Sequence, residues 1–121
     1  ARGAFWTARV FNQDISDWDV SNITGRIDRF LYVADAFNQN LGSWDLRSAS
    51  NISQFALTNT SILSTANYDA LLIGWSEYAD EFTYTGTPGF SATYTSGGAA
   101  EAARDALIAG NWAGITDDGA A

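Results

Sequence analysis

The chain has 121 residues, which is enough for one domain with its own hydrophobic core. Hydrophobic residues make up 46% of it, including five Trp, five Tyr and seven Phe, and this excludes a disordered chain. The formal net charge of −8 and the lack of any basic run argue against nucleic acid and against anionic membranes as partners. No Cys and no His are present, so thiolate nucleophiles, imidazole bases and the usual zinc ligands are excluded. No apolar run reaches the length of a membrane span, so we expect no membrane insertion by this segment and no cofactor.

A short motif occurs twice in the first half of the chain. Residues 11–20 read FNQDISDWDV and residues 37–46 read FNQNLGSWDL, at an offset of 26 residues that keeps Phe, Asn, Gln, Trp and Asp in register and exchanges apolar for apolar residues at Ile15/Leu41 and Val20/Leu46. A fixed period of about 20 to 50 residues is typical of solenoids, in which each repeat forms one coil stacked on the last. We therefore expect Phe11 to lie directly above Phe37, on parallel strands about 4.8 Å apart.

Two further side chains of the motif are expected to form columns along the stack. Asn12 above Asn38 would satisfy the backbone groups of a tight turn in successive coils. Trp18 above Trp44 would pack between the coils, because their spacing equals the repeat. The alternative is that these two indoles are exposed and anchor a sugar ring or a protein partner.

The motif breaks down in its third copy. One further period after Phe37 leads to Leu63, and no Asn-Gln pair follows it. Ser64 or Thr65 is a good helix N-cap, and with Ser64 as cap Leu63 and Tyr68 occupy the hydrophobic-staple positions. We expect a helix from about residue 65 to about residue 79, laid across the open end of the stack. Its buried face would carry Tyr68, Leu71, Leu72, Trp75 and Ala79.

The remainder of the chain is expected to alternate between short strands and one more helix. Strands are predicted at 82–85 and 90–94, with a turn at Thr87-Pro88-Gly89 between them. An Ala-rich helix should run from about Gly98 to Ala109 and end at Gly110. It would pack closely through Ala99, Ala103, Ala106 and Leu107. A last strand is predicted at 111–116, followed by a frayed tail at 117–121.

The repeated motif resembles a family of bacterial proteins. The phrases FNQDISDWDVSNIT (residues 11–24) and FNQNLGSWDL (residues 37–46) are similar to the repeats of BspA-like leucine-rich-repeat surface proteins, the DUF285 repeat. The phrase LSTANYDALL (residues 63–72) resembles the segment that ends such arrays, so the resemblance covers nearly the whole chain. It implies an extracellular protein at the cell surface, with a binding or adhesion role and no enzymatic activity.

Together, the repeat and the resemblance predict an α/β fold. We expect a short, right-handed, leucine-rich-repeat-like solenoid of about two and a half coils over residues 1–62. A C-terminal α/β cap over residues 63–121 would close it, and the two parts would form one continuous domain. The chain begins in the middle of a coil and without Met. Its uncapped N-terminal coil would therefore either follow earlier repeats or support self-association.

One departure from the family's pattern bears on the binding site. The family usually carries a Met pair in the second half of each coil, whereas this chain has no Met. The matching positions are Ala1 and Ala4, then Arg26 and Arg29, then Ile52 and Phe55. Either they face the core or its rim, where two Arg would need acidic partners, or they form a surface that varies from coil to coil. Under the second interpretation the candidate binding residues are Trp6, Arg26, Arg29, Leu31, Tyr32 and Phe55.

Acidic residues around the corners are the other chemical feature. Asp14, Asp17, Asp19 and Asn22, with Asn40 and Asp45, form the densest group of oxygen ligands, but their spacing is not that of a calcium loop. A structural role in turns is therefore favoured over a metal site. Asp19 and Asp45 recur in equivalent settings, whereas a catalytic pair of carboxylates needs two different environments. We predict that the protein is not an enzyme.

Two functional hypotheses remain at this point. The first is a recognition or adhesion module that binds a protein or glycan partner on another cell or on a host. The second is a passive spacer and terminal cap within a larger surface protein, with no ligand of its own.

Overall fold

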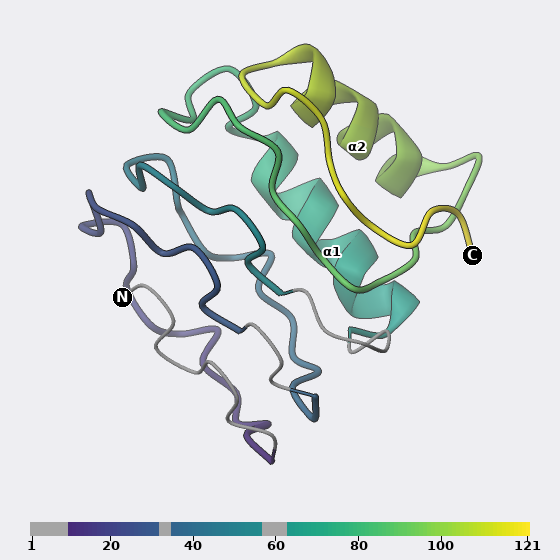
Figure 1. The fold of residues 1–121 in the computed structure, drawn as a ribbon. Helices are drawn as coiled ribbons and strands as arrows, with labels where there is room; N and C mark the ends of the chain where they lie inside the picture. Colours follow the sequence, from purple (N-terminus) through teal and green to yellow (C-terminus); the bar gives the residue numbers. More distant parts are fainter. Residues whose placement is uncertain (1–9, 32–34, 57–62) are drawn as a thin grey trace.

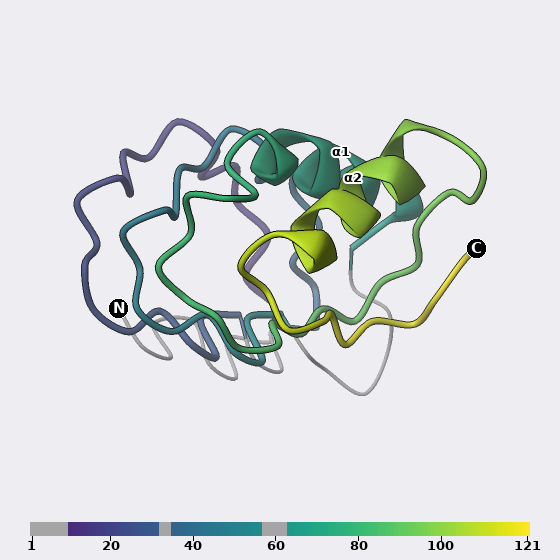
Figure 2. The same cartoon turned by 90° about the horizontal axis from the view of Figure 1, so that it is seen from above.

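The computed structural model describes residues 10–31, 35–56 and 63–121, and its two helices pack against each other on one side of the molecule (Figures 1 and 2). Helix α1 comprises Thr65–Ser76 and helix α2 comprises Ala99–Ala109. Among the described residues the extended segments are joined by isolated β-bridges rather than by continuous strands. The expected strands at 82–85 and 111–116 are absent apart from one bridge at Thr116, and 90–94 is bridged only at Phe90 and Tyr94.

The two motif copies stack as their spacing predicts. The rings of Phe11 and Phe37 are parallel to within 9°, with centroids 5.8 Å apart. The Asn12 side-chain oxygen accepts a hydrogen bond from the Asn38 amide at 2.8 Å, and Gln39 Nε2 donates to the same oxygen at 2.9 Å. The Asn column is therefore confirmed, although both Asn residues are exposed rather than buried.

Helix α1 continues this column even though its sequence lacks the motif. The Asn38 side-chain oxygen accepts from the Ser64 amide at 2.7 Å, and Asn67 Nδ2 donates to it at 2.9 Å. Ser64 and Asn67 thus make the contacts that Asn38 and Gln39 make one level earlier. Ser64 also caps the helix, because its hydroxyl accepts from the Asn67 amide at 3.1 Å.

On the other side of the stack, four extended segments lie side by side (Figure 1). Parallel bridges join 26–31 to 51–56, 51–56 to 88–94, and 88–94 to 116–121, and one antiparallel bridge joins Ser53 to Pro88. Pro88 and Gly89 accept hydrogen bonds from Thr116 and Ala56 within this array. The predicted turn at Thr87-Pro88-Gly89 is therefore wrong: these residues continue an extended segment, with Pro88 and Gly89 buried.

The register on this side is one residue shorter than that of the motif. Arg26 is bridged to Asn51, whereas the same step as from Asn12 to Asn38 would have led from Arg26 to Ile52. The rings of Phe30 and Phe55 accordingly stack at 5.6 Å and 12°. The stack thus has two registers, because the corners of successive levels need not contain equal numbers of residues.

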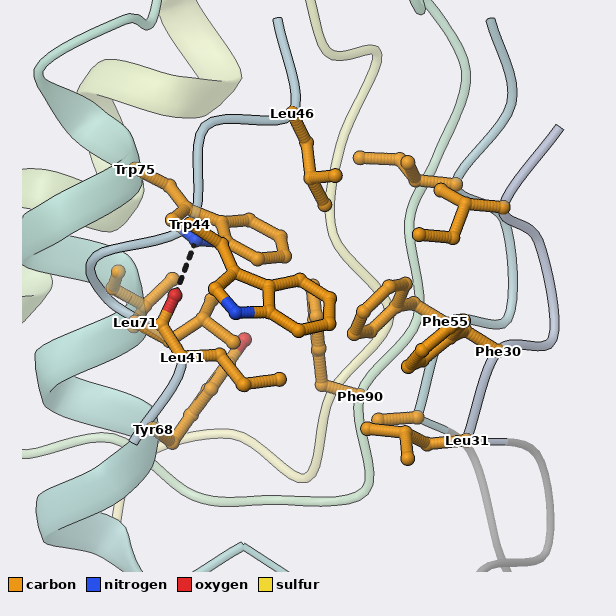
Figure 3. Packing of buried hydrophobic residues seen from close by; sticks show 14 of the residues in the cluster. Phe30, Leu31, Leu41, Trp44, Leu46, Phe55, Tyr68, Leu71, Trp75 and Phe90 are labelled. Carbon is orange, nitrogen blue, oxygen red and sulfur yellow. Dashed lines mark hydrogen bonds between the residues drawn. The ribbon is translucent and has the colours of Figure 1, made fainter. Parts of the chain in front are cut away.

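The core lies between α1 and these extended segments and combines aromatic with aliphatic side chains (Figure 3). Trp44 is 1% exposed and packs edge-on against Phe30 and Phe55, and its Nε1 donates to the Ile15 carbonyl at 3.0 Å. Trp75 of α1 repeats this bond, donating to the Leu41 carbonyl at 2.9 Å. The N–H group of each indole thus donates a hydrogen bond to a main-chain carbonyl of the preceding level of the stack.

Trp18 does not follow the expectation for its position. It is 50% exposed. The prediction that both motif indoles are buried is therefore right for Trp44 and wrong for Trp18. Trp44 is buried because it packs against Phe30 and Phe55 and bonds to the Ile15 carbonyl of the first repeat.

The first helix is close to its prediction, with Tyr68, Leu71, Leu72 and Trp75 buried. It ends at Ser76 rather than near residue 79, since the amides of Tyr78 and Ala79 bond three residues back and tighten the chain. The second helix matches its predicted limits to one residue. It is buried through Ala100, Ala103 and Leu107, whereas Ala99 and Ala106 are exposed.

The C-terminal tail is held in place rather than frayed. The Asp117 side chain is 2% exposed and accepts from Tyr68 Oη at 2.6 Å and Arg104 Nε at 2.8 Å. The amides of Tyr94 and Ala121 then bond between the two last segments. Burial and the bond to Asp117 raise the pKa of Tyr68, so its hydroxyl keeps its proton.

Candidate functional site

The corners of the two repeats and one face of α1 line an open groove of about 640 Å³. The first repeat contributes Ser16 and Asp17, and the second contributes Asn40, Gly42 and Ser43. The first repeat, the second repeat and α1 follow one another along one side of the molecule (Figure 2). The groove is therefore a consequence of stacking two corners beside a helix.

The wall that α1 provides carries Ala70, Ile73 and Gly74. These positions recur every three or four residues and so share one side of the helix. Ile73 remains 43% exposed. At Gly74 the helix backbone comes so close to the Gly42 carbonyl that a Cβ on either glycine would overlap main-chain atoms. Small residues at this contact bring α1 directly against the second corner.

Each corner is built by an Asp or Asn side chain that accepts from the amide two residues later. Asp14 accepts from Ser16 at 2.9 Å and Asn40 accepts from Gly42 at 2.8 Å, at the same position of the two repeats. Such turns need only a short side chain with an acceptor oxygen, which both Asp and Asn supply. The same local bond occurs at Asp19, Asp45, Asn51 and Asp117.

These bonds account for the acidic cluster of the sequence. Hydrogen bonds from the Ser16 hydroxyl and amide lower the pKa of Asp14 below its ordinary value of 3.8. The bonds from Ser21 lower the pKa of Asp19 in the same way. Bonds from Arg47, chiefly from its guanidinium, lower the pKa of Asp45. Among the described residues no group of three or more acidic side chains is placed to hold a metal ion.

Asp19 and Asp45 do not form a pair with divided acid and base roles. Both accept from the residue two positions later, and both pKa values are shifted in the same direction. A general acid needs a raised pKa beside an ionised partner, so this arrangement does not supply one.

The residues selected from the sequence as a binding surface do not come together. Leu31 and Phe55 are fully buried, so neither lies on a surface, and Ile52 is buried with them. They are buried because the shorter register of the second half aligns Phe55 with Phe30 and not with Arg29. Trp6 and Tyr32, like Ala1 and Ala4, lie outside the described residues.

The two arginines occupy the edge of the stack. The Arg26 side chain is 54% exposed and pairs with Asp28 at 2.9 Å, so it has the acidic partner that a position at the rim requires. Arg29 is half-buried and its Nε donates to Gln54 at 2.7 Å. Arg29 and Gln54 share a left-handed backbone, with φ of 55° and 51°, which marks them as equivalent corner positions. The expected self-association surface of the first coil includes residues 1–9, outside the described part of the chain.

Sequence reasoning did not select the groove residues as a site, although a signal was present. The two motif copies differ in chemical class at three positions only: 14 and 40, 16 and 42, and 17 and 43. The three second-copy residues, Asn40, Gly42 and Ser43, all line the groove, as do Ser16 and Asp17.

Comparison with known proteins identifies a family. The family model described as "Mycoplasma protein of unknown function, DUF285" matches residues 1–68, more than half of the chain. The match extends through Ser64 and Asn67, which continue the Asn column into α1. No curated protein and no solved structure matches the chain significantly. Within the described residues, neither helix is long and apolar enough to cross a membrane. The repeats, their stacked columns and this match together show that the chain belongs to the DUF285 family.

Proposed function

We propose that this domain is a non-catalytic recognition module at a bacterial cell surface, which binds a protein or glycan partner. The observation that carries the proposal is the position of the differences between the two repeats. Their identical residues build the scaffold, as in the stacked rings of Phe11 and Phe37 and the column from Asn12 to Asn38. Of the six residues at the chemically different positions, all but Asp14 line the groove.

This division is what a recognition surface on a repeat scaffold requires. Stacked repeats keep the side chains that hold neighbouring levels together, while the residues on one face are free to take up a ligand. Asp17 and Ser43 occupy the same position of the two copies, yet one carries a charge and the other a hydroxyl. Neither side chain is needed for the Asx turn that precedes it.

The assignment to the cell surface rests on the resemblance to BspA-like leucine-rich-repeat surface proteins. In the same proposal the stacked levels are coils of a short right-handed solenoid of that type, and the segment after residue 62 is its cap. The side-chain columns that keep register between levels, together with the parallel bridges, support the solenoid part of this proposal. The proposal that the domain is non-catalytic is supported by the similar environments of Asp19 and Asp45, because hydrogen bonds lower the pKa values of both carboxyl groups.

A passive terminal cap is the second candidate, and one observation favours it. Helix α1 takes over the contacts of the repeat through Ser64, Asn67 and Trp75 and covers the core of the second level. A domain with only this role would close a stack and bind nothing. Capping and binding are compatible in one domain, so a binding measurement decides whether the second role exists.

The test is saturable binding by the purified domain. The labelled domain is applied to a glycan array and, separately, to a panel of immobilised bacterial and host surface proteins. Recognition predicts saturable binding to a restricted set of these. Equal, non-saturable signals across all arrayed glycans and proteins would leave only the capping role.

A further inference from the structure

We propose that the open groove between the two repeat corners and α1 is a binding site for a neutral saccharide unit. This inference rests on the proposed recognition function and makes it specific by naming the ligand and the site. The groove volume of about 640 Å³ falls within the range of small-ligand sites, about 300–1,000 Å³. Ala70 and Ile73 form an apolar side, and the two corners form a polar side.

Most polar atoms of the groove are already used by the scaffold. The Ser16 hydroxyl donates to Asp14 at 2.6 Å, and the Ser43 hydroxyl donates to the Ser16 carbonyl at 3.0 Å. The Asn40 side-chain oxygen accepts from the Gly42 amide. Besides the acceptor lone pairs of the two serine hydroxyls, two side-chain groups then remain for a ligand, namely the Asp17 carboxylate and the Asn40 side-chain NH₂. Neither makes a hydrogen bond to another residue in the described part of the chain.

The chemistry of these two groups selects the ligand. An ionised carboxylate only accepts hydrogen bonds and an amide NH₂ only donates them. A sugar hydroxyl does both, so neighbouring hydroxyls of one ring can satisfy both groups while the C–H face of the ring lies on Ala70 and Ile73. A lysine ammonium only donates, and would leave the Asn40 NH₂ without an acceptor.

Charge restricts the ligand further. Asp17 is the sole charged side chain among the described residues that line the groove, and the whole chain carries a formal net charge of −8. A uronate, a sialic acid or a sulfated sugar would therefore be repelled at close range without a cation to pair with. A neutral pyranose meets no such penalty.

The repeat itself supplies substitutions that preserve the fold. Asn40→Asp retains the oxygen that accepts from Gly42 and removes the NH₂ donor, and Asp14 shows that Asp builds the same turn one level earlier. Asp17→Ser removes the carboxylate and installs the residue that the second repeat has at this position, Ser43. The matched control is Asp14→Asn, which makes the reverse exchange at a residue that does not line the groove.

The experiment is an NMR titration of the ¹⁵N-labelled domain with methyl glycosides of glucose, galactose, mannose and N-acetylglucosamine, each at millimolar concentration. We expect at least one of them to shift the amide signals of Gly42, Ser43 and Gly74. Binding should weaken at least tenfold in both Asn40→Asp and Asp17→Ser and stay within twofold in Asp14→Asn.

The other outcomes overturn the inference in separate ways. Shifts confined to other surfaces, or equal affinity in all variants, would place saccharide binding elsewhere. An absence of shifts with every glycoside would exclude this ligand class. Shifts at the groove with a lysine-rich peptide instead would make it a site for basic peptides. Array binding that survives both groove substitutions would keep the recognition function and reject this site.

Discussion

At the scale of single residues, the repeat places one type of side chain in two environments. Trp18 and Trp44 occupy the same motif position, yet Trp18 is 50% exposed and Trp44 is 1% exposed. Trp44 packs on the first repeat, and its Nε1 donates to the Ile15 carbonyl there. The same motif position therefore does not fix burial, which depends on the packing around each copy.

A comparison of these two indoles tests this point. We expect Trp44→Ala to lower the free energy of unfolding by about 3–5 kcal/mol, because it removes a buried aromatic side chain. Trp18→Ala should lower it by half of that or less. Urea unfolding followed by far-UV circular dichroism measures both. Equal losses in the two variants would contradict the difference in burial.

The carboxylates of the corners should make the stability depend on acid. The pKa values of Asp14, Asp19 and Asp45 lie below the ordinary 3.8 in the folded chain, since hydrogen bonds favour their ionised forms. Their contribution to stability is therefore complete above the pKa of the unfolded chain and is lost as the pH falls through the lower folded values.

We accordingly expect the melting temperature to fall as the pH is lowered below about 4, with the steepest loss below the ordinary Asp pKa. Asp19→Asn keeps an acceptor for the Ser21 amide but cannot titrate, so its melting temperature should fall less steeply with acid. Calorimetry across this pH range measures the slope, and an unchanged slope in Asp19→Asn would separate this carboxylate from the acid response.

At the scale of elements, a helix replaces an extended segment of the repeat and keeps its contacts. Trp44 follows Phe37 by seven residues, and Trp75 follows Leu63 by twelve. The interval from Phe37 to Trp44 is extended apart from a turn at Gly42 and Ser43, whereas the interval to Trp75 is mostly α-helix, which advances only about 1.5 Å per residue and so needs more residues. The two indoles therefore reach equivalent carbonyls, those of Ile15 and Leu41, from elements of different type.

The close approach of α1 to the second corner depends on two glycines. In an ordinary exposed helix, Gly→Ala is stabilising by about 1 kcal/mol. We expect Gly74→Ala to have the opposite sign and to destabilise by about 1–3 kcal/mol, because its Cβ would overlap the Gly42 carbonyl.

The control for this substitution is Gly25→Ala, whose Cβ would meet nothing within 4 Å. Thermal unfolding of both variants, read by circular dichroism, gives the comparison. A gain of stability in Gly74→Ala would mean that α1 is not held against the corner as closely as the structure has it.

At the scale of the whole molecule, the C-terminal tail locks the two helices to the stack. Asp117 accepts from Tyr68 of α1 and from Arg104 of α2, while its own segment is bridged to 88–94. Arg104 also lies over the ring of Tyr94, with Cζ 4.8 Å from the ring centroid. One buried carboxylate thus joins four parts of the chain that are distant in sequence.

We expect Asp117→Asn to lower the free energy of unfolding by about 3 kcal/mol, since it leaves a partly buried guanidinium without its ionised partner. Asp105→Asn is the matched control, because Asp105 lies on the exposed side of α2. Urea unfolding measures the two variants. A loss in Asp105→Asn as large as in Asp117→Asn would show an effect of net charge and not of this contact.

The sequence by itself determined the local chemistry and the first-order spacing. The constant offset between the motif copies predicted the stacked rings of Phe11 and Phe37 and the Asn column, because identical side chains at a fixed period satisfy each other on successive levels. Ser64 and Gly110 marked helix ends through the short-range bonds that caps make. Such features depend on neighbours a few residues away or on an exact repeat.

Only the tertiary structure decided the second register and the site. The extended segments after each corner pair with a step that is one residue shorter than that of the motif. The motif spacing alone aligns Phe55 with Arg29, and only the packing of the rings shows that Phe55 lies on Phe30. That single shift buries Phe55 and Leu31 and leaves Arg26 at the edge. The groove likewise exists only where two corners and a glycine-lined face of α1 meet, and contacts of this kind are set by packing in three dimensions.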